Sequence, residues 1–263
     1  MAYPLLQDRA MKNTICLFDL DGTLCREEQV VLPEMHILLS QLRQQCAIGY
    51  VSGGPISKQQ RQLSNNSVPV TSLFDFCFAE NGVTAFRMGL RLPGTSLIEW
   101  IGEPHYKAFV TWVQRYIADS DLPSKRGSFV ELRNGNMNVS PIGQLANYDE
   151  MDEFERYDRV HGIRSTMIEA LERQFANLEL QYAIGGQTCF DAFPVGWDKT
   201  YCLRHIEAEK QRSGITYNQI HFFGDKILKG QDDFELYEDR RTIGHVVVSL
   251  EDTMKQLRDL VDL

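Results

Sequence analysis

Short apolar runs alternate with amphipathic segments along the first third of the chain, and this alternation limits the folds that the chain can adopt. The runs at 14–18, 46–51 and 74–79 have the length and composition of buried strands. The segments at 33–45 and 55–64 have the apolar spacing of helices, and Pro33 suits a first helical turn. This alternation predicts an α/β fold with a parallel, doubly wound sheet, whose active site lies beyond the carboxyl ends of the strands.

The middle of the chain follows a different pattern. Residues 103–119 and about 161–177 have helical spacing, and strands are expected at about 178–184 and 187–193. Asn134-Gly135 separates two alternating runs and indicates a two-residue hairpin. That turn pairs Glu131 with Asn138, and it places Glu131, Arg133, Asn136, Asn138 and Ser140 on one polar face of the hairpin. The middle therefore predicts an α+β cap with an antiparallel sheet.

After Pro194 the first pattern returns, with a helix near 198–211, strands at 219–223 and 243–249, and a helix from 251. We expect a core domain of residues 1–90 and 195–263 and a cap domain of residues 91–194. Inserted modules on two short linkers commonly hinge, so we expect hinges near 87–93 and 192–196 and closure that excludes water.

Composition limits the kinds of partner. Of 263 residues, 43% are apolar and the net charge is −9, which argues against nonspecific binding of nucleic acid or of an anionic membrane. No apolar stretch approaches the ~18 residues of a membrane span, and the N-terminus lacks a signal-peptide pattern. The six cysteines form no CxxC pair, and we interpret them as reduced residues of a cytoplasmic protein.

Acidic residues follow two of the predicted strands. Asp19 and Asp21 follow the strand at 14–18, and Asp225 follows the strand at 219–223. Because side chains alternate along a strand, Asp19 and Asp21 could point to the same side. If these strands are neighbours, the three residues converge at one edge of the sheet. Hard oxygen ligands at such an edge suit Mg²⁺, which also keeps bound waters and contacts substrate phosphates.

This metal would enable phosphoryl transfer. Asp19 is the candidate phosphoryl acceptor, and Asp21 is the candidate general acid and base. A phosphoaspartate also needs a neutralising cation, and Lys199 follows Gly196-Trp197-Asp198 where the chain returns to the core.

The segments FDLDGTL (18–24), FAENG (78–82), KRGSFVELRNG (125–135), NVSPIG (138–143), GGQTCFDAFPVGWDKTYCLRH (185–205) and HFFGDK (221–226) occur together. With this set, the chain resembles the eukaryotic-type phosphomannomutases of the haloacid-dehalogenase superfamily. The resemblance implies a Rossmann-like core with a mobile cap. It implies conversion between mannose 6-phosphate and mannose 1-phosphate through a hexose bisphosphate, with hexose 1,6-bisphosphate as activator, in GDP-mannose biosynthesis. It also implies a homodimer through the caps.

The resemblance implies roles for individual residues. Asp19 matches the nucleophile and Asp21 the acid/base, with Mg²⁺ held by the Asp19 side chain, the Asp21 carbonyl and Asp225. A second cation site matches Tyr237, Asp239 and Thr242. The substrate-binding residues that we carry over are Arg133, Asn138, Asp191, Ser52 and Gly53.

The chain departs from the family at its phosphate-binding positions. Glu28, Gln144 and Met151 stand where the family has arginines, and Cys189 replaces a serine. The family's Gly-Gly-Ser reads Ser52-Gly53-Gly54, which displaces the serine by two positions, roughly 6–7 Å along an extended chain. Three functions stay open: a phosphomannomutase with an altered cap pocket, a sugar-phosphate phosphatase using the same phosphoaspartate, and a non-catalytic paralogue.

Overall fold

The computed structural model describes residues 3–27, 29–64 and 67–261 and divides into two compact units. Unit 1 comprises Met1–Gly94 with Asp198–Leu263, and unit 2 comprises Thr95–Trp197. The sequence placed these boundaries slightly earlier, at 90/91 and 194/195. Of the predicted first hinge, 87–93, three residues (Arg87, Leu90 and Arg91) lie in two short strands of the unit 1 sheet. The second, 192–196, begins within a strand that ends at Pro194.

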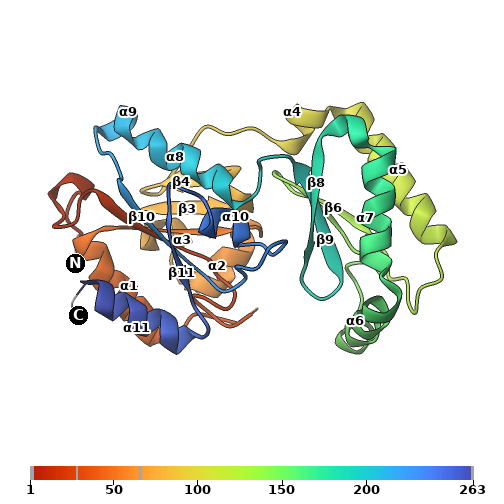
Figure 1. Ribbon diagram of the computed structural model, residues 1–263, viewed down its shortest axis with the longest axis horizontal. Coiled ribbons are helices and arrows are strands. Elements are labelled where there is room, and N and C mark those ends of the chain that lie inside the picture. Colours follow the sequence, from red (N-terminus) through yellow and green to blue (C-terminus); the bar gives the residue numbers. More distant parts are fainter. Residues whose placement is uncertain (1–2, 28, 65–66, 262–263) are drawn as a thin grey trace. The chain divides into compact units, whose positions relative to one another are not determined.

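The sheet of unit 1 has the order β11-β10-β1-β2-β3-β4-β5. The first five strands in this order are parallel, whereas β4 and β5 extend the sheet antiparallel (Figure 1). The sequence missed β4 and β5, because both are short and β5 is exposed. The bounds are β1 (Thr14–Phe18), β2 (Ala47–Ser52), β3 (Phe76–Ala79), β4 (Thr84–Arg87), β5 (Leu90–Arg91), β10 (Gln219–Gly224) and β11 (Ile243–Val246).

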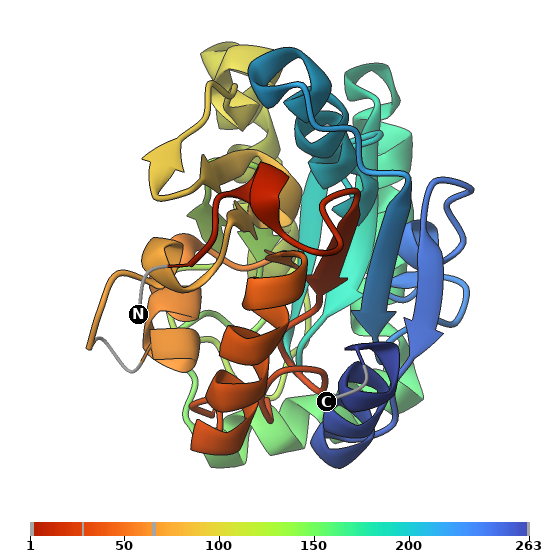
Figure 2. The same ribbon diagram turned by 90° about the vertical axis from the view of Figure 1, so that its left-hand side faces the viewer.

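Helices cover both faces of this sheet. Helices α1 (Pro33–Gln45) and α11 (Leu250–Val261) lie side by side and bury one face (Figures 1 and 2). The other face packs against α8 (Leu203–Glu207) and α10 (Phe234–Tyr237).

The predicted helix near 198–211 consists of three short elements: a 3₁₀ turn η4 (Lys199–Cys202), α8 and α9 (Glu209–Ser213). Asp198 caps the tight first turn by accepting a hydrogen bond from the Thr200 N–H. The remaining elements are η1 (Leu6–Asp8), α2 (Ile56–Ser64), α3 (Val70–Leu73) and η2 (Glu80–Gly82).

A fully buried carboxylate ties the N-terminal segment to this core. Asp75 accepts hydrogen bonds from both terminal nitrogens of Arg9, at 2.5 and 2.9 Å, and from Arg43 Nε at 2.9 Å. It also accepts from the backbone N–H of Ile48 at 3.0 Å. Both guanidinium groups are buried as well, so each depends on Asp75 for compensation of its charge.

We therefore expect Asp75→Asn to lower the free energy of unfolding by about 3–5 kcal/mol, because it leaves two buried guanidinium groups without a countercharge. Chemical denaturation measures this change, and Asp8→Asn, at an exposed position, is the control. A loss below about 1 kcal/mol, the value of an ordinary surface pair, would contradict this account.

Unit 2 contains an antiparallel sheet of order β6-β7-β9-β8. Helices α5 (Glu103–Asp119) and α7 (Ile163–Gln174) cover one face of it. The hairpin register pairs Glu131 with Asn138, as predicted, and Asn138 with Asp191. The other bounds are α4 (Leu97–Ile101), β6 (Val130–Leu132), β7 (Met137–Val139), α6 (Tyr148–His161), η3 (Ala176–Leu178), β8 (Leu180–Gly185) and β9 (Cys189–Pro194).

The predicted helix over about 161–177 corresponds to α7, and a separate helix, α6, precedes it. Gly162, in a left-handed conformation, separates α6 from α7, and Asn147 and Glu150 form a capping box that begins α6. The sequence prediction missed α6 because charged residues dominate it and only Phe154 and Asp158 are buried.

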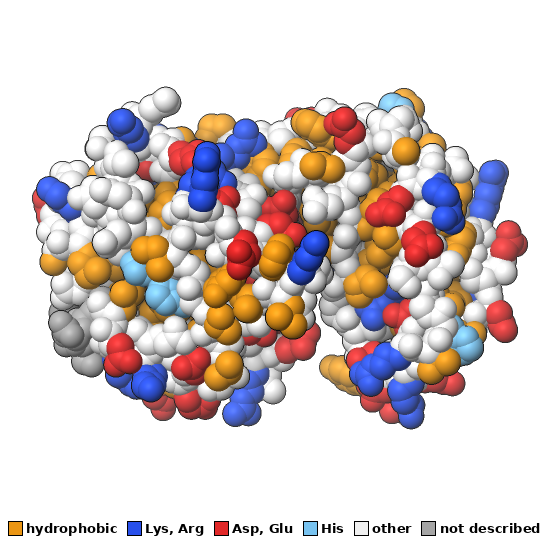
Figure 3. All heavy atoms as spheres, viewed as in Figure 1, with side chains coloured by type: hydrophobic (Ala, Val, Ile, Leu, Met, Phe, Trp, Pro, Cys, Tyr) orange, Lys and Arg blue, Asp and Glu red, His pale blue; other side chains and the backbone are white. Residues whose placement is uncertain are grey.

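The surface of each unit mixes both signs of charge. In the view of Figure 3, Lys and Arg side chains are interspersed with Asp and Glu. Among the described residues, no helix has the length and apolar character that crossing a membrane requires.

Candidate active site

The ends of β1 and β10 bring Asp19 and Asp225 together. The two strands pair in parallel, with Phe18 opposite Phe223, and the Asp19 N–H donates to the Phe223 carbonyl at 2.9 Å. Carboxylate oxygens of Asp19, Asp225 and Asp233 lie within 4.8 Å of one another. The predicted convergence of Asp19 and Asp225 is confirmed, and Asp233 is an addition that the sequence analysis missed.

Gly22 allows this close approach. Its φ of +91° is a backbone conformation that favours glycine, and a Cβ at this position would overlap the Asp225 carboxylate. The turn after Asp21 therefore requires glycine for both its conformation and its space.

Lys199 compensates part of the negative charge. Its buried ammonium contacts Asp19 and Asp233 at 2.6 Å and Asp232 at 2.7 Å. Burial alone would lower the pKa of Lys199, but the three carboxylates outweigh it and raise that pKa above its usual value. Lys199 is therefore a permanent cation beside Asp19, as the sequence predicted.

The negative charge of the carboxylates nevertheless exceeds the single positive charge of Lys199. Burial raises the pKa of Asp19 well above its usual range, and Asp233 and Asp232 add to the rise while Lys199 opposes it. Burial, with Asp233, also raises the pKa of Asp225. Oδ1 of Asp225 is buried and has no hydrogen-bond partner within the part of the chain that the structure describes. An additional cation with oxygen ligands, such as Mg²⁺, fits this donor set.

Asp233 fixes the loop that carries Asp225. Its Oδ1 accepts from Lys199, and its Oδ2 accepts from the backbone N–H groups of Asp225 and Lys226 at 3.1 and 3.0 Å. Asp233 thus links the lysine to the backbone of the predicted metal ligand.

We expect Asp225→Asn to raise the melting temperature of the metal-free protein by about 2–4 °C, the shift that corresponds to about 1 kcal/mol. Because burial raises the folded-state pKa of Asp225, its ionised form at neutral pH favours the unfolded state, and the amide removes that penalty. The same variant should lose the stabilisation that Mg²⁺ gives to the unaltered protein.

Thermal melts in EDTA and in Mg²⁺ measure both effects. Asp239→Asn is the control, because a hydrogen bond from Arg241 lowers the pKa of Asp239 and its neutralisation should not stabilise the protein. An unchanged Mg²⁺ response in Asp225→Asn would contradict the role of Asp225 as a ligand.

Contrary to the predicted convergence of three residues, the Asp21 side chain does not belong to the group of Asp19, Asp225 and Asp233. Its Oδ2 contacts Lys58 Nζ at 2.8 Å, and its Oδ1 accepts from Gln62 Nε2 at 2.7 Å. Because both carboxylate oxygens are engaged, Asp21 would contact Mg²⁺ through its backbone carbonyl. This is the ligand that the resemblance implies.

Gly54 occupies the position at which the family has its serine. The Ser52 hydroxyl lies closer to Gly54 than a separation of two residues along an extended chain would place it. Its Oγ accepts from the Gly54 N–H at 3.3 Å, and a Cβ on Gly54 would lie 3.7 Å from that oxygen. Gly53 lies between them in the same turn after β2, within the described residues.

In unit 2, the predicted substrate-binding residues form one network. Asn138 donates to Asp191 Oδ1 at 2.7 Å and accepts from Gln144 Nε2 at 2.6 Å. Arg133 pairs with Glu131 at 2.7 Å and lies 3.7 Å from Asp191 Oδ1.

Other predicted positions are less connected. Cys189 Sγ lies 3.9 Å from Gln144 Nε2, and Met151 lies half-buried in the first turns of α6. Glu28 lies outside the described residues.

The residues of the expected second cation site lie close in sequence around the end of α10. Thr242 Oγ1 donates to the carbonyls of Leu236 and Asp239, whereas the Asp239 carboxylate pairs with Arg241 at 2.6 Å. Tyr237 packs beside Gly244. The side chain of Asp239 is thus engaged by a cation of the chain itself, and a second metal stays a prediction.

Sequence analysis missed Asp232, Asp233, Lys58 and Gln62. Two signals were available: an acidic pair a few residues beyond Asp225, directly before a helix, and polar residues spaced by four on the helix that follows the second strand.

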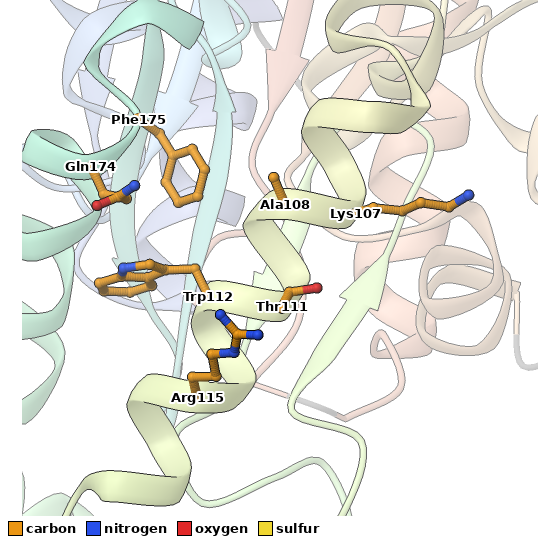
Figure 4. A pocket seen from close by; sticks show the side chains of 7 residues that line it. All are labelled: Lys107, Ala108, Thr111, Trp112, Arg115, Gln174 and Phe175. Atoms are coloured by element: carbon orange, nitrogen blue, oxygen red, sulfur yellow. The ribbon is translucent and has the colours of Figure 1, made fainter.

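A separate hollow of about 360 Å³ lies on the helical side of unit 2 (Figure 4). It is lined by five residues of α5 and by Gln174 and Phe175 at the end of α7. None of the predicted site residues lines it.

Comparisons with known proteins agree on one family. Residues 35–263 match the family model described as eukaryotic phosphomannomutase. The chain is 47% identical over 263 residues to a phosphomannomutase of Schizosaccharomyces pombe, covering 100% of both chains. It is 47% identical over 251 residues to a phosphomannomutase of Saccharomyces cerevisiae, covering 95% of each.

A solved haloacid dehalogenase-like hydrolase from Bacteroides thetaiotaomicron shares the fold. Its TM-score is 0.58 at 12% identity, over 94% of this chain and 99% of that one. The predicted haloacid-dehalogenase fold is thereby confirmed.

Proposed function

The chain belongs to the eukaryotic phosphomannomutase family, and we propose that it interconverts mannose 6-phosphate and mannose 1-phosphate through a phosphoaspartate on Asp19 and a hexose bisphosphate. The observation that carries this proposal is the buried Asp19 carboxylate 2.6 Å from Lys199, in a group with Asp225 and Asp233. A nucleophile, a fixed cation and a carboxylate set that suits Mg²⁺ are the parts that phosphoryl transfer needs.

Each residue has a defined task in this proposal. Asp19 attacks phosphorus, and Asp21 gives a proton to the departing sugar oxygen and later takes one from the attacking hydroxyl. Lys199 neutralises charge on the phosphorylated Asp19. Asp19 and Asp225, with the Asp21 carbonyl, would hold Mg²⁺, which supplies further neutralisation of the phosphoryl oxygens.

Substrate-binding roles are proposed for each unit separately. In unit 1, Ser52 and the Gly53 turn would hold the transferring phosphoryl group. In unit 2, Arg133 would bind the distal phosphate, and Asn138 and Asp191 would bind sugar hydroxyls. We also propose hexose 1,6-bisphosphate as activator, a cytoplasmic location and a homodimer.

Hydrolysis is the second candidate activity, because of the charge on the polar face of unit 2. Arg133 is paired with Glu131, and its neighbour Asp191 is also acidic. Gln144, which joins this network, is neutral. A mutase must retain a bisphosphate through two transfers, and this face offers it little positive charge. We therefore expect weak mutase activity and a comparable or faster release of inorganic phosphate.

The test supplies mannose 1-phosphate, Mg²⁺ and catalytic hexose 1,6-bisphosphate, and follows mannose 6-phosphate and inorganic phosphate in parallel. Formation of mannose 6-phosphate supports the mutase, and phosphate release that Asp19→Asn removes supports the phosphatase. Absence of both products from folded, Mg²⁺-binding protein would overturn the proposal in favour of a non-catalytic paralogue.

Restoring positive charge at Gln144 and Met151 should raise mutase turnover. We expect at least about a tenfold gain from Gln144→Arg with Met151→Arg, because each charge-assisted contact contributes about 1.5–3 kcal/mol and tenfold requires about 1.4 kcal/mol. The control is Leu145→Arg with Tyr148→Arg, which adds the same charge at two exposed positions of the same segment. Equal gains in the two double variants would show that general charge, not these positions, limits the mutase.

A further inference from the structure

Two residues of α2 hold the side chain of Asp21 from one side. Lys58 and Gln62 are four positions apart, so both project from the same face of the helix. Lys58 Nζ contacts Oδ2 of Asp21 at 2.8 Å, and Gln62 Nε2 donates to Oδ1 at 2.7 Å. Each oxygen of the carboxylate thus has a separate donor, and the direction of the group is fixed.

Gln62 is itself immobilised. Its side chain is 1% exposed, and its Nε2 also lies 3.6 Å from Cys25 Sγ. Its backbone carbonyl accepts from the Val31 N–H at 2.9 Å. The amide therefore holds Asp21 from a rigid part of the core.

The turn before α2 sets the path of Lys58. Gln59 accepts from the Tyr50 hydroxyl at 3.2 Å and donates to the Gly54 carbonyl at 2.7 Å, which ties the turn to β2. A Cβ on Gly54 would lie 3.2 Å from Cδ of Lys58, so the lysine passes closely over this glycine. The ammonium reaches Asp21 along a defined route.

We propose that Lys58 and Gln62 are positioning residues for proton transfer by Asp21, an inference that rests on the proposed function. They hold the carboxyl group apart from the Asp19, Asp225 and Asp233 group, so that in the proposed reaction it would face the oxygen of the sugar. In the first transfer, the Asp21 carboxyl gives its proton to the sugar oxygen as the O–P bond breaks and the bond from Asp19 to phosphorus forms. In the second, the Asp21 carboxylate takes the proton of the attacking hydroxyl as the new O–P bond forms and the bond to Asp19 breaks.

Two phosphoryl donors with different leaving groups distinguish a positioning role for Lys58 and Gln62 from a general structural effect on the site. A sugar alkoxide leaves only if it is protonated, so it depends on the placement of Asp21. Acetate, the leaving group of acetyl phosphate, is a weak base and departs without a proton. In the proposed function both donors would phosphorylate the same Asp19, and only one of them would need Asp21.

The experiment measures the rate of phosphoenzyme formation in a rapid-quench burst, with hexose 1,6-bisphosphate and with acetyl phosphate. In Lys58→Met we expect the rate with the bisphosphate to fall by about tenfold or more. Complete removal of general acid–base catalysis usually costs about 10²-fold or more, and this variant misplaces Asp21 without removing it. With acetyl phosphate the rate should stay within about twofold. Lys58→Arg, which keeps the donor, should recover part of the loss, and Gln62→Leu should repeat the selective loss. Lys255→Met, at an exposed lysine of unit 1, is the control.

Equal losses with both donors would overturn the inference, because they would indicate a structural role. Unchanged rates with both donors would overturn it as well. If the unaltered protein forms no phosphoenzyme with either donor, the proposed function fails and this inference fails with it.

Discussion

Asp19→Asn should lower both formation of mannose 6-phosphate and release of phosphate by at least about a thousandfold, because an amide cannot accept the phosphoryl group. The side chain is buried beside Lys199, so water has little room to replace the missing oxygen nucleophile. Initial rates of both products, with the fold checked by circular dichroism, measure the effect.

Asp19→Glu separates loss of the nucleophile from loss of charge. It keeps an anion for Lys199 but moves the attacking oxygen by about one bond length, and a misplacement of about 1 Å can cost about 10²-fold. We expect it to be impaired and still stabilised by Mg²⁺. Substantial turnover in Asp19→Asn would show that another group carries the phosphoryl.

Lys199→Met should abolish turnover and also destabilise the protein. The buried ammonium contacts three carboxylates, and its removal leaves their charges uncompensated, at a cost of about 3–5 kcal/mol. The melting temperature should fall by about 10 °C in EDTA, and by less in Mg²⁺, because a bound cation supplies part of the missing charge.

Lys226→Met is the matched control for this variant. Lys226 is exposed and adjoins Asp225, and it contributes its backbone N–H rather than its ammonium to Asp233. Its replacement should leave stability within about 1 kcal/mol. A Lys199→Met protein as stable in EDTA as the unaltered chain would contradict the charge balance described here.

The alternation of apolar runs and amphipathic segments was sufficient to predict most of unit 1. The strand at 14–18 and the helix at 33–45 match β1 and α1, because a fully buried strand and a helix with one apolar stripe have strong local signals. The short strands β4 and β5 and the charged helix α6 were missed. β4 has only four residues, and β5 and α6 bury little apolar surface, so their conformation depends on neighbours that the sequence pattern does not identify.

Sequence analysis predicted those site residues that directly follow the ends of strands. Asp19 and Asp225 follow paired strands, and parallel topology alone brings such residues together. Asp233 lies in a loop beyond Asp225, and its role depends on backbone N–H groups and on a lysine distant in sequence. Such a tertiary arrangement leaves no periodic signal in the chain.

The direction of the Asp21 side chain was also beyond sequence reasoning. Alternation along a strand suggested that Asp19 and Asp21 could point the same way, but the chain turns at Gly22, and Lys58 and Gln62 hold Asp21 separately. The hairpin of unit 2 was predicted with its register, because Asn134-Gly135 specifies the turn and thereby every pair beyond it.

The most direct test locates the phosphoryl group after brief incubation with Mg²⁺ and hexose 1,6-bisphosphate. Borohydride converts an acyl phosphate on aspartate into homoserine, which mass spectrometry detects after tryptic digestion. The account predicts homoserine at position 19, in the peptide of residues 13–26, and none in Asp19→Asn. Homoserine at Asp21, Asp225 or Asp233, or none in protein whose melting responds to Mg²⁺, would contradict it.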